Sequence, residues 1–277
     1  MDRCQLIERS IITTYRSKLW SKFVKALKEY QLLSPGDCVC VCISGGKDSI
    51  VMAKLFQELK KHSDFEFDVK FLVMNPGYNE KNLEVIKNNL EILQIPAEIK
   101  NTDIFEIASI QEKSPCYLCA KMRRGALYKL AKEMGCNKIA LGHHYDDVIE
   151  TTLMNMLNVG SFQTMLPKLH SQNYEGMELI RPLYLIREKD ILAWKNYNNL
   201  EFIACACKLT EGRDTGKLSS QRANTKALIK DLIKYCPFAE KNIFKSTTNV
   251  YIDKILGWKK DGVNYSYLDF YDKTEEE

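Results

Sequence analysis

The sequence lacks the features that would place the chain in or across a membrane. No stretch of the 277 residues is long and apolar enough to span a bilayer. Residues 1–30 carry charges throughout and lack the apolar run of a signal peptide. These absences predict a cytoplasmic protein with no membrane partner.

The chain also lacks a dominant charge, an internal repeat and a low-complexity linker. Its 40 basic and 36 acidic residues give a net charge of +4, which indicates an anionic partner only weakly. A chain of this length can bury a sizeable core, either as one large domain or as one domain with appended helices. We expect a helical N-terminal segment over 1–34, a catalytic domain over 35–235 and a C-terminal extension over 236–277.

Apolar strand patterns and helical patterns alternate along the chain. Residues 38–44 have the composition of a buried strand, and residues 49–61 have the spacing of a helix. The pattern then repeats, with strands expected at 67–75, 97–103 and 138–143 and helices at 79–93, 119–134 and 146–157. This alternation predicts an α/β fold, a Rossmann-like parallel sheet covered by helices on both faces. Apolar positions at helical spacing over 5–30 predict the extra helical N-terminal segment.

The segment Ser44–Ser49, SGGKDS, lies directly between the first strand and its helix. Its two glycines allow a tight turn whose backbone N–H groups face inward, and the following helix adds its positive dipole end. Lys47 supplies a full charge, and the two serines supply hydroxyl donors. A glycine turn with solvated polar residues is the alternative, but the strand–loop–helix context favours a pyrophosphate site.

This loop is neither of the two commonest phosphate-binding motifs. Val41 stands where the first glycine of a Walker A loop should be, and Asp48 follows the lysine. The spaced glycines of a dinucleotide fingerprint are missing as well.

A second polar segment, Gly142–Thr151 with the sequence GHHYDDVIET, follows the fourth predicted strand. It places His143 at the carboxyl end of that strand, where open α/β sheets bind ligands. The acidic side chains Asp146, Asp147 and Glu150 gather around the start of the next helix, where they suit Mg²⁺ binding or helix capping. Capping accounts for one aspartate but not for the whole set. His144 could equally be a structural residue beside the site.

Ten cysteines without a secretory signal are expected to be thiols, metal ligands or catalytic groups, not a disulfide framework. Those of the first strand alternate with apolar residues and are expected to act as small hydrophobes. Three others, Cys4, Cys136 and Cys236, stand alone in the sequence. The remaining group is Cys116, Cys119, Cys205 and Cys207.

Cys116 and Cys119 open a predicted helix that continues through Arg123 and Arg124. A helix N-terminus and nearby cations favour the thiolate form. Four interpretations stay open at this point: a structural Cys₄ zinc site, a redox dithiol, inert buried thiols, and an iron–sulfur cluster held by three thiolates with one iron open.

The two polar segments resemble motifs of the PP-loop ATP pyrophosphatases. Ser44–Ser49 matches their SGGxDS signature, and Gly142–Thr151 is similar to their GHxxDDxxET segment. The resemblance implies that ATP is cleaved between its α and β phosphates and that the adenylate passes to a carbonyl-type oxygen. It implies Mg²⁺ near Asp48 and an ATP site made of Ser44, Gly45, Gly46, Lys47, Asp48, Ser49, Gly142, His143 and Asp147.

The stretch 114–128, SPCYLCAKMRRGALY, resembles the PCxLCxxxRRGxLY segment of the tRNA 2-thiocytidine synthetases. In that family three cysteines hold a 4Fe–4S cluster beside the PP-loop, which implies Cys116, Cys119 and Cys205 here. The family's third cysteine opens a Pro-Cys-x-x-Cys segment, whereas this chain has Ala204-Cys205-Ala206-Cys207. Cys207 therefore stays an alternative third ligand.

The resemblance implies an enzyme that adenylates the C2 oxygen of an anticodon-loop cytidine in tRNA and replaces it with sulfur. Lys47, Asp48 and the three cysteines would be the catalytic residues, and Arg123 and Arg124 would contribute to an RNA-binding face. Further expected partners are a sulfur donor such as a cysteine desulfurase and, in a homodimer, a second copy of the chain.

Three rival functions stay open. They are a zinc-stabilised adenylating ligase or amidotransferase, a thiolase of another RNA base or of a small molecule, and a non-catalytic ATP-binding sensor. A sensor that only binds ATP would not need the group of Cys116, Cys119, Cys205 and Cys207.

Overall fold

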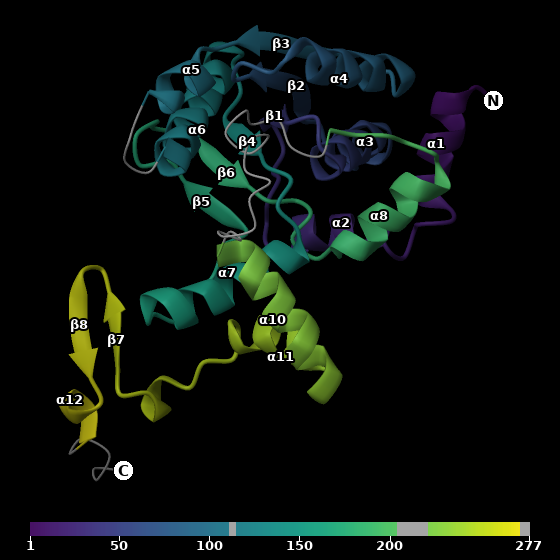
Figure 1. Cartoon of the computed structure of the whole chain (residues 1–277). Helices are drawn as coiled ribbons and strands as arrows, with labels where there is room; N and C mark the ends of the chain where they lie inside the picture. Colours follow the sequence, from purple (N-terminus) through teal and green to yellow (C-terminus); the bar gives the residue numbers. More distant parts are fainter. Residues whose placement is uncertain (111–114, 204–220, 272–277) are drawn as a thin grey trace. The chain divides into compact units, whose positions relative to one another are not determined.

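The computed structural model of the chain describes residues 1–110, 115–203 and 221–271 (Figure 1). It has two compact units. The first consists of Met1–Val148 with Met165–Ser220, and the second of Ile149–Thr164 with Gln221–Glu277. The three segments predicted from the sequence have different limits and stay a prediction.

A six-stranded sheet with the order β3-β2-β1-β4-β6-β5 forms the centre of the first unit. Its strands are β1 (Cys38–Ile43), β2 (Asp68–Asn75), β3 (Ala97–Asn101), β4 (Lys138–Ala140), β5 (Lys168–His170) and β6 (Glu178–Ile180). All neighbouring pairs run parallel except β5 and β6, which pair antiparallel at one edge. The predicted α/β class is confirmed. The antiparallel edge strand was not predicted, and it arises because only a short connection separates β5 from β6.

Two hydrophobic cores cover the two faces of this sheet, as predicted. Val39, Val41 and Ile43 of β1 belong to the larger core, whereas Cys40 and Cys42 belong to the smaller one. This division follows from the two-residue period of a strand, which sends alternate side chains to opposite faces. The cysteines of β1 thus pack as the small hydrophobes that the sequence predicted.

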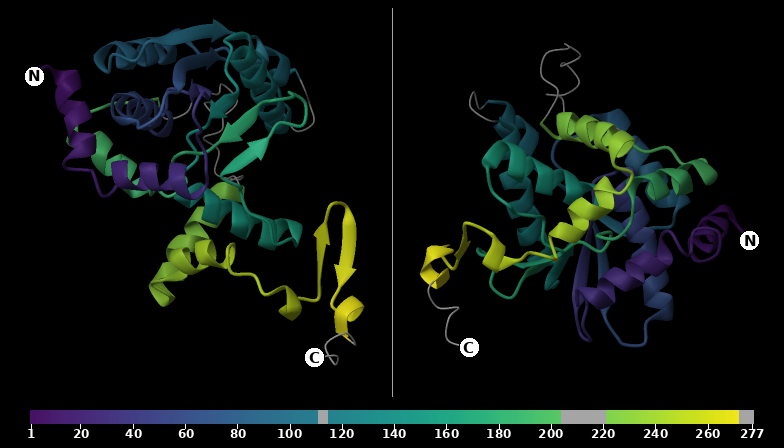
Figure 2. Two further views of the ribbon diagram at one scale, coloured as in Figure 1. Left: turned by 180° about the vertical axis from the view of Figure 1, so that it is seen from behind. Right: turned by 90° about the horizontal axis from the view of Figure 1, so that it is seen from below.

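The larger core is formed with α1 (Arg3–Ile12), α2 (Trp20–Glu29), α3 (Lys47–His62), α4 (Glu80–Ile92) and α8 (Glu188–Tyr197). The smaller core is formed with α6 (Pro115–Glu133), which follows the short α5 (Ile104–Ser109). Figure 2 shows α1 and α2, drawn in purple, on the same side of the sheet as α3. Cys136, which stands alone in the sequence, has its Sγ 3.3 Å from that of Cys38, because β1 and β4 are neighbours in the sheet.

Three helix boundaries differ from the predicted ones. The helix expected at Ser49 begins at Lys47, and the helix expected at Cys119 begins at Pro115, a residue well suited to a first helical position. The helix expected to reach residue 157 is α7 (Tyr145–Met154), and the chain continues as a π-helical turn over Asn155–Val159.

The second unit is helical with a small hairpin. It contains the second half of α7, then α10 (Gln221–Tyr235), α11 (Ala239–Ser246), a 3₁₀ turn (Ile252–Lys254), β7 (Gly257–Lys260), β8 (Val263–Ser266) and α12 (Leu268–Tyr271). The Trp258 ring stacks on Tyr265 and Phe270, with ring centroids 5.3 and 5.4 Å away. No helix in the described part of the chain has the length and apolar character needed to cross a bilayer.

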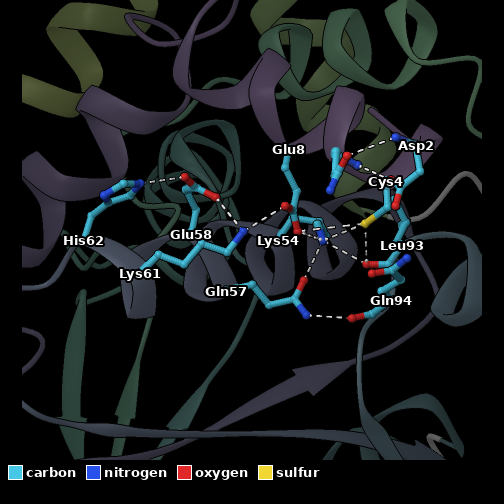
Figure 3. A network of polar contacts seen from close by, with 11 residues as sticks. Asp2, Cys4, Glu8, Lys54, Gln57, Glu58, Lys61, His62, Leu93 and Gln94 are labelled. Carbon is cyan, nitrogen blue, oxygen red and sulfur yellow. Dashed lines mark hydrogen bonds and ion pairs between the residues drawn. The ribbon is translucent and has the colours of Figure 1, made fainter.

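A buried lysine ties α1 to the sheet-covering helices (Figure 3). Lys54 of α3 is fully buried, and its Nζ donates to Glu8 Oε1 at 2.7 Å, to Gln57 Oε1 at 2.6 Å and to the carbonyl of Leu93 at 2.8 Å. An ammonium group is tolerated inside a protein only when it is paired and hydrogen-bonded. This network therefore fixes α1 and the end of α4 to α3.

The carboxylate of Glu8 has a second cation, because Lys61 Nζ lies 2.8 Å from its Oε2. Burial alone raises the pKa of Glu8, but hydrogen bonds from Lys54 and Lys61 outweigh that effect and lower the pKa below its ordinary value. Glu8 is thus held in its charged form.

We predict that Glu8→Ala lowers the free energy of unfolding by about 3 kcal/mol, because it leaves the Lys54 ammonium buried without its carboxylate. Urea denaturation at neutral pH measures this loss. Glu29→Ala is the matched control: its carboxylate pairs with Lys25 at the surface, so the loss should stay below about 0.5 kcal/mol. Equal losses in the two variants would contradict the assigned role of Glu8.

The same variant should show a defined pH dependence. A carboxyl group with a lowered pKa stabilises the folded state above its unfolded pKa of about 4.3 and loses that contribution as the pH falls through the folded value. The difference in unfolding free energy between the wild type and Glu8→Ala should therefore be largest at neutral pH and shrink below about pH 4.

Candidate active site

The loop between β1 and α3 has the backbone conformation that its glycines predict. Gly45 has a φ of +82°, and a Cβ at this position would lie 2.6 Å from the side chain of Ile86. Ser49 Oγ donates to the carbonyl of Gly46 at 2.9 Å and accepts from the N–H of Ser44 at 3.1 Å. The loop is therefore closed on itself at the start of α3, where helix amides are available to an anion.

The second motif meets this loop at van der Waals distance. A Cβ at Gly142 would lie 3.1 Å from the amide nitrogen of Ser49 and 3.2 Å from the carbonyl carbon of Asp48. Both neighbours are backbone atoms, which cannot move aside as a flexible side chain can. Glycine at position 142 is thus what allows the end of β4 to lie against the first turn of α3.

A cavity of about 380 Å³ opens where these segments meet. Six of the residues predicted for the ATP site line it: Ser44, Asp48, Ser49, Gly142, His143 and Asp147. The opposite wall comes from α6, through Arg123, Arg124 and Leu127. Gly45, Gly46 and Lys47 belong to the same loop and the same helix start.

Of the predicted thiol ligands, the structure describes the side chain of Cys119 only. Cys119 is half-buried on α6, and Cys116 belongs to the first turn of that helix. Residues three apart in a helix lie on the same face, as a shared ligand requires. Cys205 and Cys207 lie outside the described residues.

Tyr78 is bonded to the phosphate loop. Its hydroxyl donates to the carbonyl of Ser44 at 3.2 Å. Burial raises the pKa of Tyr78, while the charge of Arg123 acts in the opposite direction and Cys119 adds to the rise. The helix that carries Cys119 lines the same cavity as the phosphate loop through Ala120 and Arg123, so a cluster held by Cys119 would lie beside the ATP site.

Within the second motif, His144 and Asp147 cap the start of α7. The N–H of His144 donates to Asp147 Oδ2 at 2.9 Å, and the N–H of Asp147 approaches His144 Nδ1 at 3.4 Å. His144 is buried, and its Nε2 is 3.8 Å from Asp48 Oδ1. Glu150, by contrast, belongs to the second unit, where its Oε2 is 3.7 Å from Arg222 Nε.

Asp48 has the donor atom that a divalent cation needs. Its Oδ2 is 3.0 Å from Lys47 Nζ, whereas its Oδ1 is buried and accepts no hydrogen bond from the described residues. No group of three or more histidine, cysteine or acidic side chains in the described ranges could hold a metal ion. Mg²⁺ commonly takes one or two carboxylates and completes its shell with phosphate oxygens and water, so Asp48 fits such a site.

Sequence reasoning missed two residues that contact the motifs, Arg187 and Glu188. Glu188 Oε1 lies 3.1 Å from Lys47 Nζ, and the backbone N–H of Glu188 donates to Asp146 Oδ2 at 2.7 Å. Arg187 donates to Asp146 Oδ1 from Nε at 3.1 Å and from Nη2 at 2.9 Å. In the sequence the two residues stand at the start of a helix, where an acidic residue in the first turn is expected to offset the helix dipole.

A third overlooked residue, Arg181, lies at the end of β6 and is 5% exposed. It donates from Nη1 to the carbonyl of Leu166, and its buried Nε has no hydrogen-bond partner among the described residues. Burial, reinforced by the charge of Arg124, lowers the pKa of Arg181 to about 10. Arg181 is therefore a buried cation, which no local sequence pattern reveals.

Comparison with known proteins agrees with this geometry. A PP-loop domain model matches residues 16–207. The tRNA-cytidine(32) 2-sulfurtransferase of Geotalea uraniireducens is 34% identical over 251 residues, which are 88% of this chain and 94% of the relative. The protein of the same name from Photobacterium profundum is 36% identical over 244 residues, covering 85% of this chain and 77% of that one.

Among solved structures, the U34-tRNA thiolase NcsA from Methanococcus maripaludis, determined with its [4Fe-4S] cluster, is similar with a TM-score of 0.64. The match covers 87% of this chain and 80% of that one at 22% sequence identity, so it bears on the fold alone. The family model and the full-length relatives agree with what the two motifs and the Cys-x-x-Cys helix predict. The chain belongs to the PP-loop family and, within it, to the tRNA-cytidine(32) 2-sulfurtransferases.

Proposed function

We propose that this chain is an ATP-dependent tRNA sulfurtransferase, which adenylates the C2 oxygen of an anticodon-loop cytidine and replaces that oxygen with sulfur. The observation that carries the proposal is the shared cavity, whose walls are the phosphate loop, the second motif and the arginine-bearing helix after Cys119. The names of the full-length relatives support tRNA cytidine as the substrate.

The phosphate loop would perform the first half of the reaction. Backbone amides at the start of α3 and the ammonium of Lys47 bind the phosphate groups, and the C2 oxygen attacks the α-phosphorus. The new C2–O–P linkage forms as the bond from the α-phosphorus to the bridging oxygen breaks, and pyrophosphate leaves. Mg²⁺, held through Asp48 Oδ1, would supply charge neutralisation on the departing pyrophosphate. Lys47 adds to that stabilisation.

The thiols would serve the second half. Cys116, Cys119 and either Cys205 or Cys207 would hold a 4Fe–4S cluster, which supplies an iron open to sulfide. As the C2–S bond forms, the C2–O bond breaks and AMP leaves with the oxygen. Arg123 and Arg124 would bind RNA phosphates beside the cavity, and the cavity walls would keep water from the activated carbon. The sulfide would come from a donor such as a cysteine desulfurase.

Two other functions fit the same ATP site. A zinc-stabilised ligase or amidotransferase would use an amine or ammonia as nucleophile, and its metal content would distinguish it. A thiolase of another base, or of a small molecule, would differ only in the acceptor of sulfur.

The first prediction from the proposed function concerns ATP. Lys47→Ala or Asp48→Ala should lower the rate of pyrophosphate release at least about 100-fold, because the first removes a positive charge on the phosphates and the second removes the carboxylate that would hold Mg²⁺. Label from the β phosphate of ATP should appear in pyrophosphate with the wild type. Lys60→Ala, a change on the same helix at a surface pair with Asp68, is the matched control and should keep full activity. Release of ADP and orthophosphate would contradict adenylation.

The second prediction concerns the metal. The wild type purified without oxygen should contain about four irons and four sulfides per chain and absorb like an iron–sulfur protein. Cys119→Ala and Cys205→Ala should abolish iron binding, whereas Cys236→Ala, at an exposed thiol on the second unit, should not. If Cys207→Ala loses the cluster and Cys205→Ala keeps it, Cys207 is the third ligand in place of Cys205. Stoichiometric zinc with no iron uptake on reconstitution would refute the cluster.

The third prediction concerns the RNA. Arg123→Glu or Arg124→Glu should weaken the binding of unmodified tRNA at least about tenfold and reduce the salt dependence of binding, because phosphate contacts are lost. Lys129→Glu, on the same helix but at a surface pair with Glu133, is the matched control and should have little effect. Filter binding at several salt concentrations measures both. Unchanged binding in all three variants would exclude α6 from the RNA site.

Product analysis completes that prediction. The cluster-loaded enzyme with ATP, Mg²⁺, sulfide and unmodified tRNA should yield 2-thiocytidine among the nucleosides, and free cytidine should be a poor substrate. Unstacked loop nucleotides expose their base edges, whereas a free nucleoside lacks the backbone contacts. If thiolated uridine is the only thiolated nucleoside found, the enzyme is specific for uridine and not for cytidine.

A further inference from the structure

The ammonium of Lys47 is already engaged by two carboxylates. Its Nζ lies 3.0 Å from Asp48 Oδ2 and 3.1 Å from Glu188 Oε1. All three side chains are between 20 and 27% exposed, so water screens these contacts only in part. An ammonium group has three N–H donors, and two are directed at these oxygens. At most one donor is left for a phosphate oxygen.

Glu188 cannot follow the lysine if Lys47 turns towards a phosphate. The backbone N–H of Glu188 is bonded to Asp146, and the preceding Arg187 holds the other oxygen of the same carboxylate. Further along α8, Ile191 and Trp194 are fully buried in the larger core. The first turn of α8 is therefore fixed, and the backbone of Glu188 stays in place while its carboxylate remains within reach of the loop.

Burial alone lowers the pKa of Lys47, and the two carboxylates reverse that effect and raise it above its ordinary value. The lysine is thus fully charged without a ligand. The contact with Glu188 lies outside the buried face of α3, because Lys47 is at the helix start and the buried side chains of the helix begin at Ser49. A partly exposed ion pair on the lysine of the phosphate loop can be exchanged for a ligand at small cost.

We propose that Glu188 is a positioning residue that holds Lys47 in the nucleotide-free enzyme and competes with the phosphate groups for it. When ATP binds, the Lys47 ammonium must break its ion pair with Glu188 to contact the phosphates. The ion pair forms again when pyrophosphate leaves. The carboxylate thereby weakens the binding of both anions and favours release of the product. This inference rests on the proposed use of ATP and goes beyond it, because it assigns the residue that sets the affinity.

The test is the binding of pyrophosphate and of ATP, each with Mg²⁺, to the full chain purified without oxygen and without tRNA. Glu188→Gln keeps the size of the side chain and removes its charge. The Kd for both anions should fall roughly threefold to tenfold, as expected when one partly exposed competing ion pair is lost. Glu188→Asp keeps the charge and should bind closer to the wild type than the glutamine variant does.

Asp190→Asn is the matched control. It removes one negative charge from the same first turn of α8, but its carboxylate pairs with Lys22 at 3.0 Å and does not contact Lys47. Its Kd for both anions should equal that of the wild type. Thermal melting of each variant checks the fold, and if Glu188→Gln melts early, Glu188→Ala provides the same comparison.

A double-variant cycle separates competition for Lys47 from direct repulsion of the phosphates. In the Lys47→Met background, Glu188→Gln should no longer tighten binding, because the shared lysine is gone. Persistence of the effect there would overturn the proposal, as would weaker or unchanged binding by Glu188→Gln alone or equal tightening by Asp190→Asn. A wild type that binds neither anion would refute the proposed function instead.

Discussion

The backbone contact between Gly142 and the first turn of α3 is the constraint on which the rest of the site depends. β1 and β4 are neighbours in the sheet and run parallel, so their carboxyl ends meet at one edge. At that edge the segment after β4 lies very close to the first turn of α3. A Cβ at position 142 would therefore clash with the backbone of Asp48 and Ser49. This contact sets the width of the cavity and brings His143 and Asp147 to the phosphate loop. A wider approach would separate groups that must act on one nucleotide.

Two lysines of α3 illustrate how burial separates a structural charge from a functional one. Lys54 is fully buried, and its ammonium attaches α1 through Glu8 and the end of α4 through the carbonyl of Leu93. Lys47, at the start of the same helix, is partly exposed and shares its charge with carboxylates that a ligand can replace. A buried ion pair resists exchange because breaking it leaves an uncompensated charge in a medium of low polarity. A partly hydrated pair exchanges at small cost.

The wall opposite the loop gives the cavity its chemical asymmetry. Carboxylates gather on the side of α3 and α7, through Asp48 and Asp147, whereas α6 presents Arg123 and Arg124. This separation suits a ligand with its cation on one side and an anionic backbone on the other. Arg181 is buried at the end of β6, and the charge of Arg124 contributes to its lowered pKa.

The sequence by itself determined the α/β class, the positions of strands β1 to β4 and of the helices that alternate with them, and the two motifs of the nucleotide site. These follow from local signals: the two-residue and 3.6-residue periods of apolar side chains, and glycines at a strand–helix turn. Only the tertiary structure decided that Cys136 contacts Cys38 and that Glu188 reaches Lys47. It alone decided that Arg181 is buried and that β5 pairs antiparallel at the edge. It also decided that Glu150 belongs to the second unit, unlike Asp146 and Asp147 of the same motif. Each of these depends on which distant segments the sheet order and helix packing make neighbours, and a local pattern carries no information about a partner far along the chain.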